Sequence, residues 1–410
     1  MYAGVVICKK CVMDSSVPAW KESKDGCNYC DSARFTRVYD ESALWDLASK
    51  IRETSKDSPY DVVLGLSGGL DSSFSLHLAK QLDLRVFVVH MDNGWNDVIA
   101  QNNIKSLVQS LNFDLNTYVI EWSEMLSLQK SFFDADVIDV ELLYDQAVSA
   151  ILFLKARELN IKFIVLGTNN ATEGIPMPIG WSWKNKSDVR NILDIHRKYG
   201  DNTKITSYPL FSTFDIMNSE TNFGIRRVSL LDRYNYSKLE AEQKLVERYD
   251  YKVYKEKHGE SFFTRFYQNV ILPLKFNVDK RKVHLSSLVI NGELNREDAL
   301  QVLNQKRNFE SIDRDDLYFF LDKFEWQIDD FMLYLKRPPV SHSRFKSDED
   351  FLGVPRAIYK NLKKYRFTNV QDTTTILSTP KSSMEDLNRL KKIGYKCVVR
   401  AEKTLSKLGF

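Results

Sequence analysis

The pattern of apolar and polar residues predicts strands that alternate with helices over the first half of the chain. Short, almost continuous apolar runs at residues 62–66 and 84–90 are typical of strands buried on both faces, and residues 115–120 and 161–166 predict a third and a fourth strand. Helix-like patterns lie before and between them, at 40–50, 97–112 and 142–159. Because such alternation is typical of βαβ units, we expect an α/β fold with a doubly wound parallel sheet. A last short apolar piece begins at Tyr208, and we expect the α/β unit to end near Leu231.

The remaining sequence predicts further parts on either side of this unit. Beyond Tyr236 the pattern becomes helical, and residues 295–335 show acidic amphipathic helices that end at Pro338-Pro339. Residues 374–377, 384–393 and 397–400 predict a strand–helix–strand piece. We therefore expect a cysteine-rich module at 1–40, the α/β domain at 41–231, a helical substrate-binding or partner region at 232–340, and a small α/β piece of unknown function at 341–410.

The stretch at 61–75, DVVLGLSGGLDSSFS, is the one around which the α/β domain is organised. It predicts a buried strand, a turn and a helix whose N-terminus favours an anion. Gly68 and Gly69 let the backbone approach that anion, and hydroxyl donors come from Ser67, Ser72 and Ser73. No Walker A lysine follows the glycines, so Asp71 is the residue suited to hold Mg²⁺ against phosphate oxygens. The alternative is an ordinary strand–turn–helix corner with a serine cap.

The form S-G-G-x-D-S resembles the pyrophosphate loop (PP-loop) of the N-type ATP pyrophosphatases. This resemblance implies ATP that is cut between its α- and β-phosphates, with AMP left on a substrate oxygen. Ligands of open α/β sheets bind beyond the carboxyl ends of the strands. Asp92, Asn93 and Gly94 follow a predicted strand, so we expect them to contact adenosine, as the same turn does in related enzymes. The alternative is that these three residues form a plain turn.

Residues 167–173, GTNNATE, resemble the G-T-D-x-x-x-E stretch of NAD synthetase, with Asn169 in place of the aspartate. By that match Gly167 and Thr168 belong to the ATP site and Glu173 is a second Mg²⁺ ligand. The alternative is that Glu173 is only a surface carboxylate.

Two cysteine pairs predict a metal site near the start of the chain. Fifteen residues separate Cys8-x-x-Cys11 from Cys27-x-x-Cys30, which fits the spacing of a structural zinc site. Four thiolates close a tetrahedral shell and leave no open position for catalysis. Two redox dithiols or an iron–sulfur cluster are the alternatives.

Composition limits the classes of partner and the compartment. Lys and Arg number 58 against 55 Asp and Glu, and a formal charge of +3 is too balanced for a nucleic-acid-coating protein. No apolar run approaches the ~18 residues that span a bilayer, and the start lacks the layout of a signal peptide. We therefore expect a cytoplasmic protein with reduced cysteines.

Cations and aromatics alternate in the segment 255–282, a mixture that suits a ligand with phosphates and a flat ring. The candidate substrate-binding cations are Lys257, His258, Arg265, Arg281 and Lys282. A solvated helix face is the ordinary alternative. The loop at 174–186, GIPMPIGWSWKNK, predicts a binding element or lid, or else a packed structural cover.

Most of residues 1–340 resemble the N-acetyl sugar amidotransferases of bacterial lipopolysaccharide and surface-glycan (O-antigen) biosynthesis. The resemblance rests on CVMD with CNYC around the cysteine pairs, SGGLDS, GTNNATE, Lys257-His258-x-Glu260-Ser261 with Thr264-Arg265-Phe266, and Asp279-Lys280-Arg281-Lys282-x-His284-Leu285-Ser286. It implies adenylation of the N-acetyl oxygen of a UDP-linked sugar. Ammonia then displaces AMP and leaves an acetamidino group.

The ammonia is expected to come from another subunit. Position 2 is Tyr2, and Cys397 lies in KCVV without the G-x-C-x-G of a glutaminase. The resemblance implies a glutaminase partner with a cyclase-like subunit, similar to the pair in imidazole glycerol phosphate synthase.

Two other functions compete with this interpretation. A tRNA-thiolating enzyme would share the nucleotide loop, but it usually needs reactive cysteines beside that loop. A non-catalytic scaffold that only retains the fold is the second competitor. The presence of both Asp71 and Glu173 argues against it.

Overall fold

The computed structural model describes residues 4–34, 40–254, 257–305 and 307–351. The predicted strand–helix–strand piece at 374–400, with Cys397, lies outside the described residues. Contacts divide the chain into two units, 1–347 and 348–410, and the described part of the second is a single turn, η5 (Asp348–Asp350). All that follows concerns the first unit.

Five parallel strands form the central sheet, which confirms the predicted α/β class. They are β1 (Val62–Gly65), β2 (Val86–Asp92), β3 (Asp114–Val119), β4 (Phe163–Leu166) and β5 (Arg226–Ser229), in the order β3-β2-β1-β4-β5. The four predicted strands are the first four strands of the sheet. Strand β3 lies at one edge, pairs only with β2 and is mostly exposed, so it is not buried on both faces. Strand β5, Arg-Arg-Val-Ser, lies at the other edge, pairs only with β4 and carries no apolar run. The apolar piece at Tyr208 is a buried loop and not a strand.

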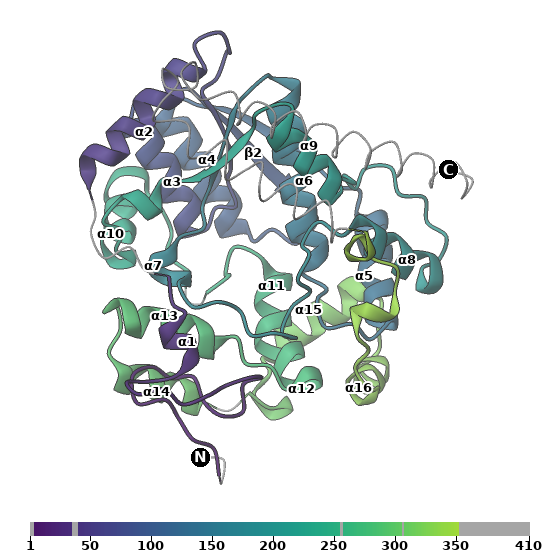
Figure 1. Ribbon diagram of the computed structural model, residues 1–410. Helices are drawn as coiled ribbons and strands as arrows, with labels where there is room; N and C mark the ends of the chain where they lie inside the picture. The colour runs from purple at the N-terminus through teal and green to yellow at the C-terminus, as the bar shows by residue number, and fades with distance from the viewer. Residues whose placement is uncertain (1–3, 35–39, 255–256, 306, 352–410) are drawn as a thin grey trace, which may run out of the picture. The chain divides into compact units, whose positions relative to one another are not determined.

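Helices cover both faces of the sheet, as Figure 1 shows. Val62, Leu64 and Val88 pack toward α2 (Glu41–Thr54), α3 (Leu70–Gln81), α4 (Val98–Leu111) and α10 (Lys238–Tyr249). Val63 and Ile164 face the other way, toward α6 (Leu142–Glu158) and α9 (Thr213–Thr221). Burial of alternate strand residues on opposite faces explains why these strands are apolar throughout.

A second, aromatic core joins the N-terminal module to the later helices. It includes α5 (Trp122–Asp134) and α8 (Val189–Tyr199), together with α11 (Phe262–Phe266), a π-helical turn η2 (Tyr267–Ile271), α12 (Leu272–Phe276), α13 (Arg281–Asn291), α15 (Arg314–Phe324) and α16 (Ile328–Lys336). The Phe133 ring centroid, for example, lies 4.9 Å from that of Phe324 and 4.8 Å from that of Tyr334. Helix α14 (Arg296–Asn304) packs on α13.

Short elements complete the described part: α1 (Asn28–Asp31), α7 (Asn170–Glu173), η1 (Leu231–Arg233), η3 (Phe309–Ser311) and η4 (His342–Arg344). None of the helices in the described ranges is long and apolar enough to cross a membrane.

The strand order fixes where a ligand can bind. Strand β1 has β2 on one side and β4 on the other, so the connections after β1 and β4 leave the sheet in opposite directions. In open α/β sheets the crevice at such a switch point, beyond the carboxyl ends of the strands, is the ligand site. SGGLDS follows β1 and GTNNATE follows β4, so the topology brings both motifs to this crevice.

Candidate functional site at the switch point of the sheet

The turn after β1 has a backbone that glycine alone can adopt. Gly68 has φ of +82°, and a Cβ there would lie 2.7 Å from the carbonyl oxygen of Ala100. Its own carbonyl accepts hydrogen bonds from the hydroxyls of Tyr251 (3.1 Å) and Tyr254 (3.0 Å). Gly69 then caps α3 without a side chain, which leaves the first N–H groups of that helix accessible to a ligand. The turn is therefore built as an anion-binding helix N-terminus.

The loop after β4 lies against this turn. A Cβ at Gly167 would be 3.0 Å from both Cα and N of Ser72, so the predicted close approach of the two motifs is present. Asn169, which replaces the expected aspartate, caps α7 by accepting from the Thr172 N–H at 2.8 Å. Its buried Nδ2 has no hydrogen-bond partner among the described residues. The Thr168 carbonyl accepts from Ser229 Oγ at 2.8 Å, which ties the loop to the edge strand.

Asp71 and Glu173, the two predicted Mg²⁺ ligands, are close enough for the charge of Glu173 to affect the pKa of Asp71. Burial raises the pKa of Asp71, the charge of Glu173 raises it further, and a hydrogen bond from the Tyr236 hydroxyl to Oδ1 acts in the opposite direction. Glu173 stands at the end of α7 and is partly exposed. Two carboxylates whose charges disfavour one another offer the hard oxygen ligands that Mg²⁺ prefers, so the residues fit such an ion.

The turn after β2 reaches the same edge of the sheet. Asp92 Oδ1 accepts from the N–H of Gly94 at 3.1 Å, and Asn93 Oδ1 accepts from Trp95 N at 3.1 Å. A Cβ at Gly94, whose φ is +81°, would lie 2.6 Å from Trp122. These side chains therefore shape the turn itself, and their contact with adenosine stays a prediction.

The segment that begins at Lys257 closes over the site from the C-terminal half of the chain. Its backbone pairs with the turn after β2, through Phe262 N–H to Trp95 O and Asp97 N–H to Glu260 O, both at 3.2 Å. The Glu260 carboxyl lies against the PP-loop, 3.1 Å from where a Cβ of Gly69 would be. Burial would raise the pKa of Glu260, but His258, with Nδ1 3.6 Å from Oε1, lowers it below its ordinary value.

Lys257 and His258 are thus the predicted cations that the structure brings to the nucleotide loop. Lys257 Nζ lies 3.7 Å from Glu173 Oε1 and 3.1 Å from His284 Nδ1.

The other three predicted cations have carboxylate partners elsewhere. Arg265 makes a bidentate pair with Asp316 (2.6 and 2.8 Å), and Arg281 pairs with Asp279 at 2.7 Å. Lys282 pairs with Asp14 of the cysteine-rich module at 2.6 Å. These contacts stabilise the helical region, and a substrate role for the three cations remains a prediction.

Three residues of the site were not among the predicted ligands: Tyr236, Glu260 and His284. Glu260 and His284 stand inside motifs of the family resemblance, so a signal for them was present. Tyr236 has none, because only the fold brings it to Asp71.

The four N-terminal cysteines converge, as their spacing predicts. One ligand atom from each of Cys8, Cys11, Cys27 and Cys30 lies within 4.8 Å of the others, and all four are buried. Neighbouring sulfurs are 3.6 to 3.9 Å apart. A tetrahedral ion with Zn–S bonds of about 2.3 Å would hold its sulfurs roughly 3.8 Å apart. The cluster can therefore hold a single metal ion.

This module is attached to the helix that carries His284. Arg296 donates to the carbonyl oxygens of Cys8 (2.7 Å) and Cys11 (3.1 Å), and Val12 N–H donates to Ser286 Oγ at 3.2 Å. Helix α13 in turn packs on α7, and just after α7 the N–H of Ile175 donates to Ser287 Oγ. The metal cluster and the PP-loop are thus linked through one helix.

Two protein families match the chain. Residues 45–184 match NAD synthase, which together with the parallel sheet defines a PP-loop, ATP-using enzyme. Residues 260–366 match the C-terminal domain of proteins described as LPS biosynthesis protein WbpG-like. The two matches support a WbpG-like enzyme of the PP-loop superfamily that acts in glycan biosynthesis, as the motifs of the chain predict.

The solved structures that match the chain share little sequence with it. The ammonia-dependent NAD synthetase of Campylobacter jejuni, solved with nitrate, is 19% identical over 52% of this chain and 94% of its own, with a TM-score of 0.27. NMN synthetase of Francisella tularensis is 14% identical over 65% and 92%, with a TM-score of 0.29. The U34-tRNA thiolase NcsA of Methanococcus maripaludis, with its iron–sulfur cluster, is 15% identical over 67% and 84%, also at 0.29. No curated protein matches the chain.

Proposed function

We propose that this chain is an ATP-dependent amidotransferase that converts the N-acetyl group of a nucleotide-linked sugar into an acetamidino group. The observation that carries the proposal is the closure of the PP-loop by the segment 257–260. This segment supplies a cation and a carboxylate, and it leads directly into the WbpG-like domain. The WbpG-like domain, whose match begins at Glu260, would thereby contribute a side chain to the proposed ATP site.

The reaction has two steps that balance without any oxidant or reductant. The amide oxygen of the substrate attacks the α-phosphorus of ATP, forms a P–O bond and expels pyrophosphate. Ammonia then adds to the activated carbon, and the C–O bond breaks so that AMP leaves with the former amide oxygen. A proton lost from the added nitrogen leaves the amidine.

In the first step the residues of the loop would orient and neutralise the phosphates. The N–H groups at the start of α3 and the ammonium of Lys257 would bind the departing pyrophosphate. Mg²⁺, held by Asp71 and Glu173, would supply further charge neutralisation at that pyrophosphate. The enzyme thus works mainly by positioning and electrostatics.

The ammonia is proposed to come from a separate glutaminase, accompanied by a cyclase-like subunit. In support, all four cysteines of the described ranges belong to the metal cluster, so none of them is placed as a glutaminase nucleophile. The same placement disfavours the tRNA-thiolating alternative, because no described thiol lies beside the PP-loop.

The metal is proposed to be Zn²⁺ in a structural role. Sulfur separations of 3.6 to 3.9 Å suit one tetrahedral ion, whereas a four-iron cluster is larger and would hold its thiolates further apart.

The proposed reaction is tested by AMP and pyrophosphate formation from ATP with a panel of UDP-N-acetyl sugars and ammonium, with the product analysed by mass spectrometry. We expect a product one mass unit lighter than its substrate, since NH replaces O. The isolated chain should use ammonium and not glutamine, and it should work best at alkaline pH, where neutral ammonia is abundant. AMP formation that depends on tRNA instead of a sugar would sink the proposal.

A further inference from the structure

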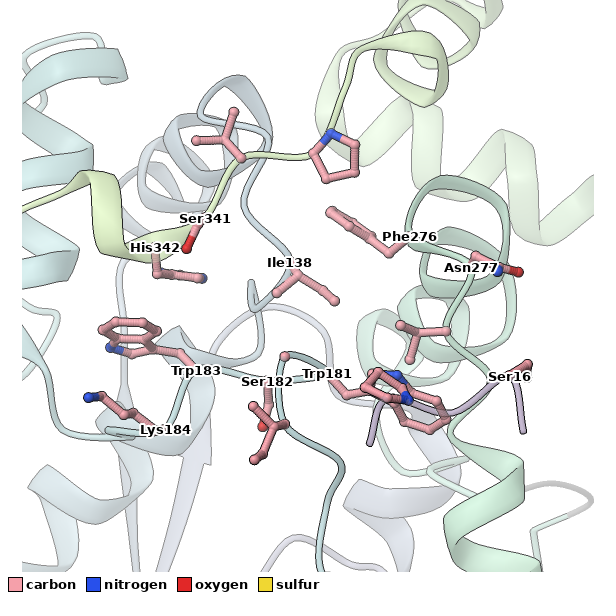
Figure 2. Close-up of a pocket in the computed structure, with 16 residues that line it drawn as sticks. Ser16, Ile138, Trp181, Ser182, Trp183, Lys184, Phe276, Asn277, Ser341 and His342 are labelled. Carbon is pink, nitrogen blue, oxygen red and sulfur yellow. The ribbon is translucent and has the colours of Figure 1, made fainter. Parts of the chain in front are cut away.

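A second concave site lies apart from the PP-loop, in the same unit of the chain. It has a volume of about 640 Å³, which is in the usual range for small-molecule sites. Four segments far apart in sequence line it, namely Ser16 with Pro18, residues 179–184, 276–278 and 339–342, together with Ile138. In Figure 2, Trp183, Lys184 and His342 stand on one side and Trp181, Phe276 and Asn277 on the other.

One wall of this pocket is a fixed aromatic surface. The Trp183 ring stacks on His342 with centroids 5.2 Å apart and planes 22° apart, and its indole N–H donates to Asp188 at 2.9 Å. His342 is itself held, because Nδ1 lies 2.7 Å from Asn191 Oδ1 and Nε2 accepts from the N–H of Asp139. A rigid aromatic wall favours a flat ligand and costs little conformational entropy on binding.

The opposite side supplies hydrogen-bonding groups. Trp181 is 5% exposed and lines the pocket, and its indole N–H donates to no acceptor among the described residues, so it can donate to a ligand. Asn277 is exposed, and its side-chain amide also has no hydrogen-bond partner in the described ranges. Its φ of +53° at the C-cap of α12 turns this residue out of the helix. An indole donor and an amide, which both donates and accepts, on the same side of the pocket suit the edge of a pyrimidine dione.

The pocket is close to the PP-loop along α13. Val278 lines the pocket, and His284 follows it by six residues. The last four of these six residues, 281–284, form the first turn of α13. His284 contacts Lys257 at the PP-loop. At 1.5 Å per helical residue the separation is on the order of 10 Å. Lys282 on the same turn donates to Ser16, which also lines the pocket. A ribose and a diphosphate bridge a gap of this kind.

From these observations we infer that the pocket binds the uracil base of the nucleotide-linked substrate, while the N-acetyl sugar at the other end of the diphosphate reaches the PP-loop. The assignment of this ligand rests on the proposed function. It goes further in naming where the base binds and which residues select it.

The inference is tested by calorimetric titration of the full chain with UMP, which carries the base but no sugar. Asn277→Gly removes the amide and keeps the left-handed backbone, and Trp181→Phe keeps an aromatic ring and removes the donor. We expect each to weaken UMP binding roughly five- to tenfold, the usual effect of one lost hydrogen bond. Asn112→Gly is the matched control, since Asn112 is also exposed and left-handed at the C-cap of α4.

The outcomes separate this inference from the reaction itself. If UMP binds and both variants weaken it, the pocket stands even where no amidine forms. If amidine forms but UMP binding is the same in Asn277→Gly and in Asn112→Gly, the pocket is wrong and the reaction stands. Binding of N-acetylglucosamine 1-phosphate that depends on Asn277, without binding of UMP, would also overturn the inference, because the pocket would then hold the sugar.

Discussion

The ammonium nitrogen of Lys257 lies 3.1 Å from Nδ1 of His284, although the two residues come from a loop and from a helix 27 positions further along the chain. Burial, followed by the charges of Lys257, Lys238 and His258, lowers the pKa of His284 well below its ordinary value. The imidazole is therefore neutral near pH 7, and its Nδ1 can accept a hydrogen bond from the lysine. We infer that His284 is a positioning residue that holds the Lys257 ammonium beside Glu173, 3.7 Å away.

Replacement of His284 should weaken the handling of ATP more than the fold. We expect His284→Leu to lower kcat/KM for ATP about tenfold, since one charge-assisted hydrogen bond to Lys257 is lost. His284→Gln keeps an acceptor and should recover part of the loss. Steady-state kinetics of AMP formation with ATP as the varied substrate measures both. If His284→Leu and His284→Gln had the same kcat/KM for ATP, the hydrogen bond to Lys257 would have no role in the handling of ATP.

Asp71 must be ionised to hold a cation, so its environment sets the acid limb of activity. Burial raises the pKa of Asp71, and the Tyr236 hydroxyl acts against that rise. Tyr236→Phe should therefore raise the pKa further and move the acid limb of AMP formation to higher pH. Asp71→Asn should abolish AMP formation while the circular dichroism spectrum stays native. A pH–rate profile of Tyr236→Phe that superimposes on the wild-type profile contradicts this role.

Removal of the metal should destabilise α13 and thereby lower activity at the PP-loop. Arg296 and Ser286 attach the cysteine module to the helices that position His284. Metal analysis should find one zinc per chain. After chelation, hydrogen exchange of amides in α13 should accelerate, and AMP formation should fall with it. Cys27→Ser should reproduce both effects. Loss of zinc with no change in exchange at α13 would show that the module is not coupled to the site.

Buried histidines should make the protein sensitive to mild acid. Burial lowers the pKa of His77 and of His342 to about 4, from an ordinary value of 6.5. Above pH 6.5 both are neutral in the folded and the unfolded chain. As the pH falls from 6.5 toward 4, only the unfolded chain takes up protons, so the free energy of unfolding decreases.

Each of these histidines contributes a slope that approaches about 1.4 kcal/mol per pH unit within that window. Urea titrations at pH 7, 6 and 5 measure it. His77→Gln should make the dependence shallower, because Gln does not titrate and can still reach the Tyr249 hydroxyl, which lies 2.7 Å from the histidine. An unfolding free energy that is constant from pH 7 to pH 5 would contradict the assignment.

Local sequence determined the elements that carry the chemistry. Strands β1, β2 and β4 and the helices between the strands follow from apolar periodicity, since burial on both faces demands continuous apolar runs, whereas β3 lies at an edge and is mostly exposed. The two-glycine turn and the cysteine spacing are equally local, because a positive φ at Gly68 and a tetrahedral cluster each depend on residues close in sequence. The order of strands was not readable, but the position of the motifs after β1 and β4 was enough to predict one shared crevice.

Only the tertiary structure decided which of the cations reach that crevice. Lys257 and Arg281 look alike in sequence, yet one lies beside Glu173 and the other is paired with Asp279. The edge strand β5 and the contact of Tyr236 with Asp71 are likewise invisible in the sequence, and the loop 174–186 gave no sign of the segments that join it around the pocket. Each depends on segments brought together from distant parts of the chain. A side chain's partner is set by the packing of whole helices and strands, and no local pattern encodes that packing.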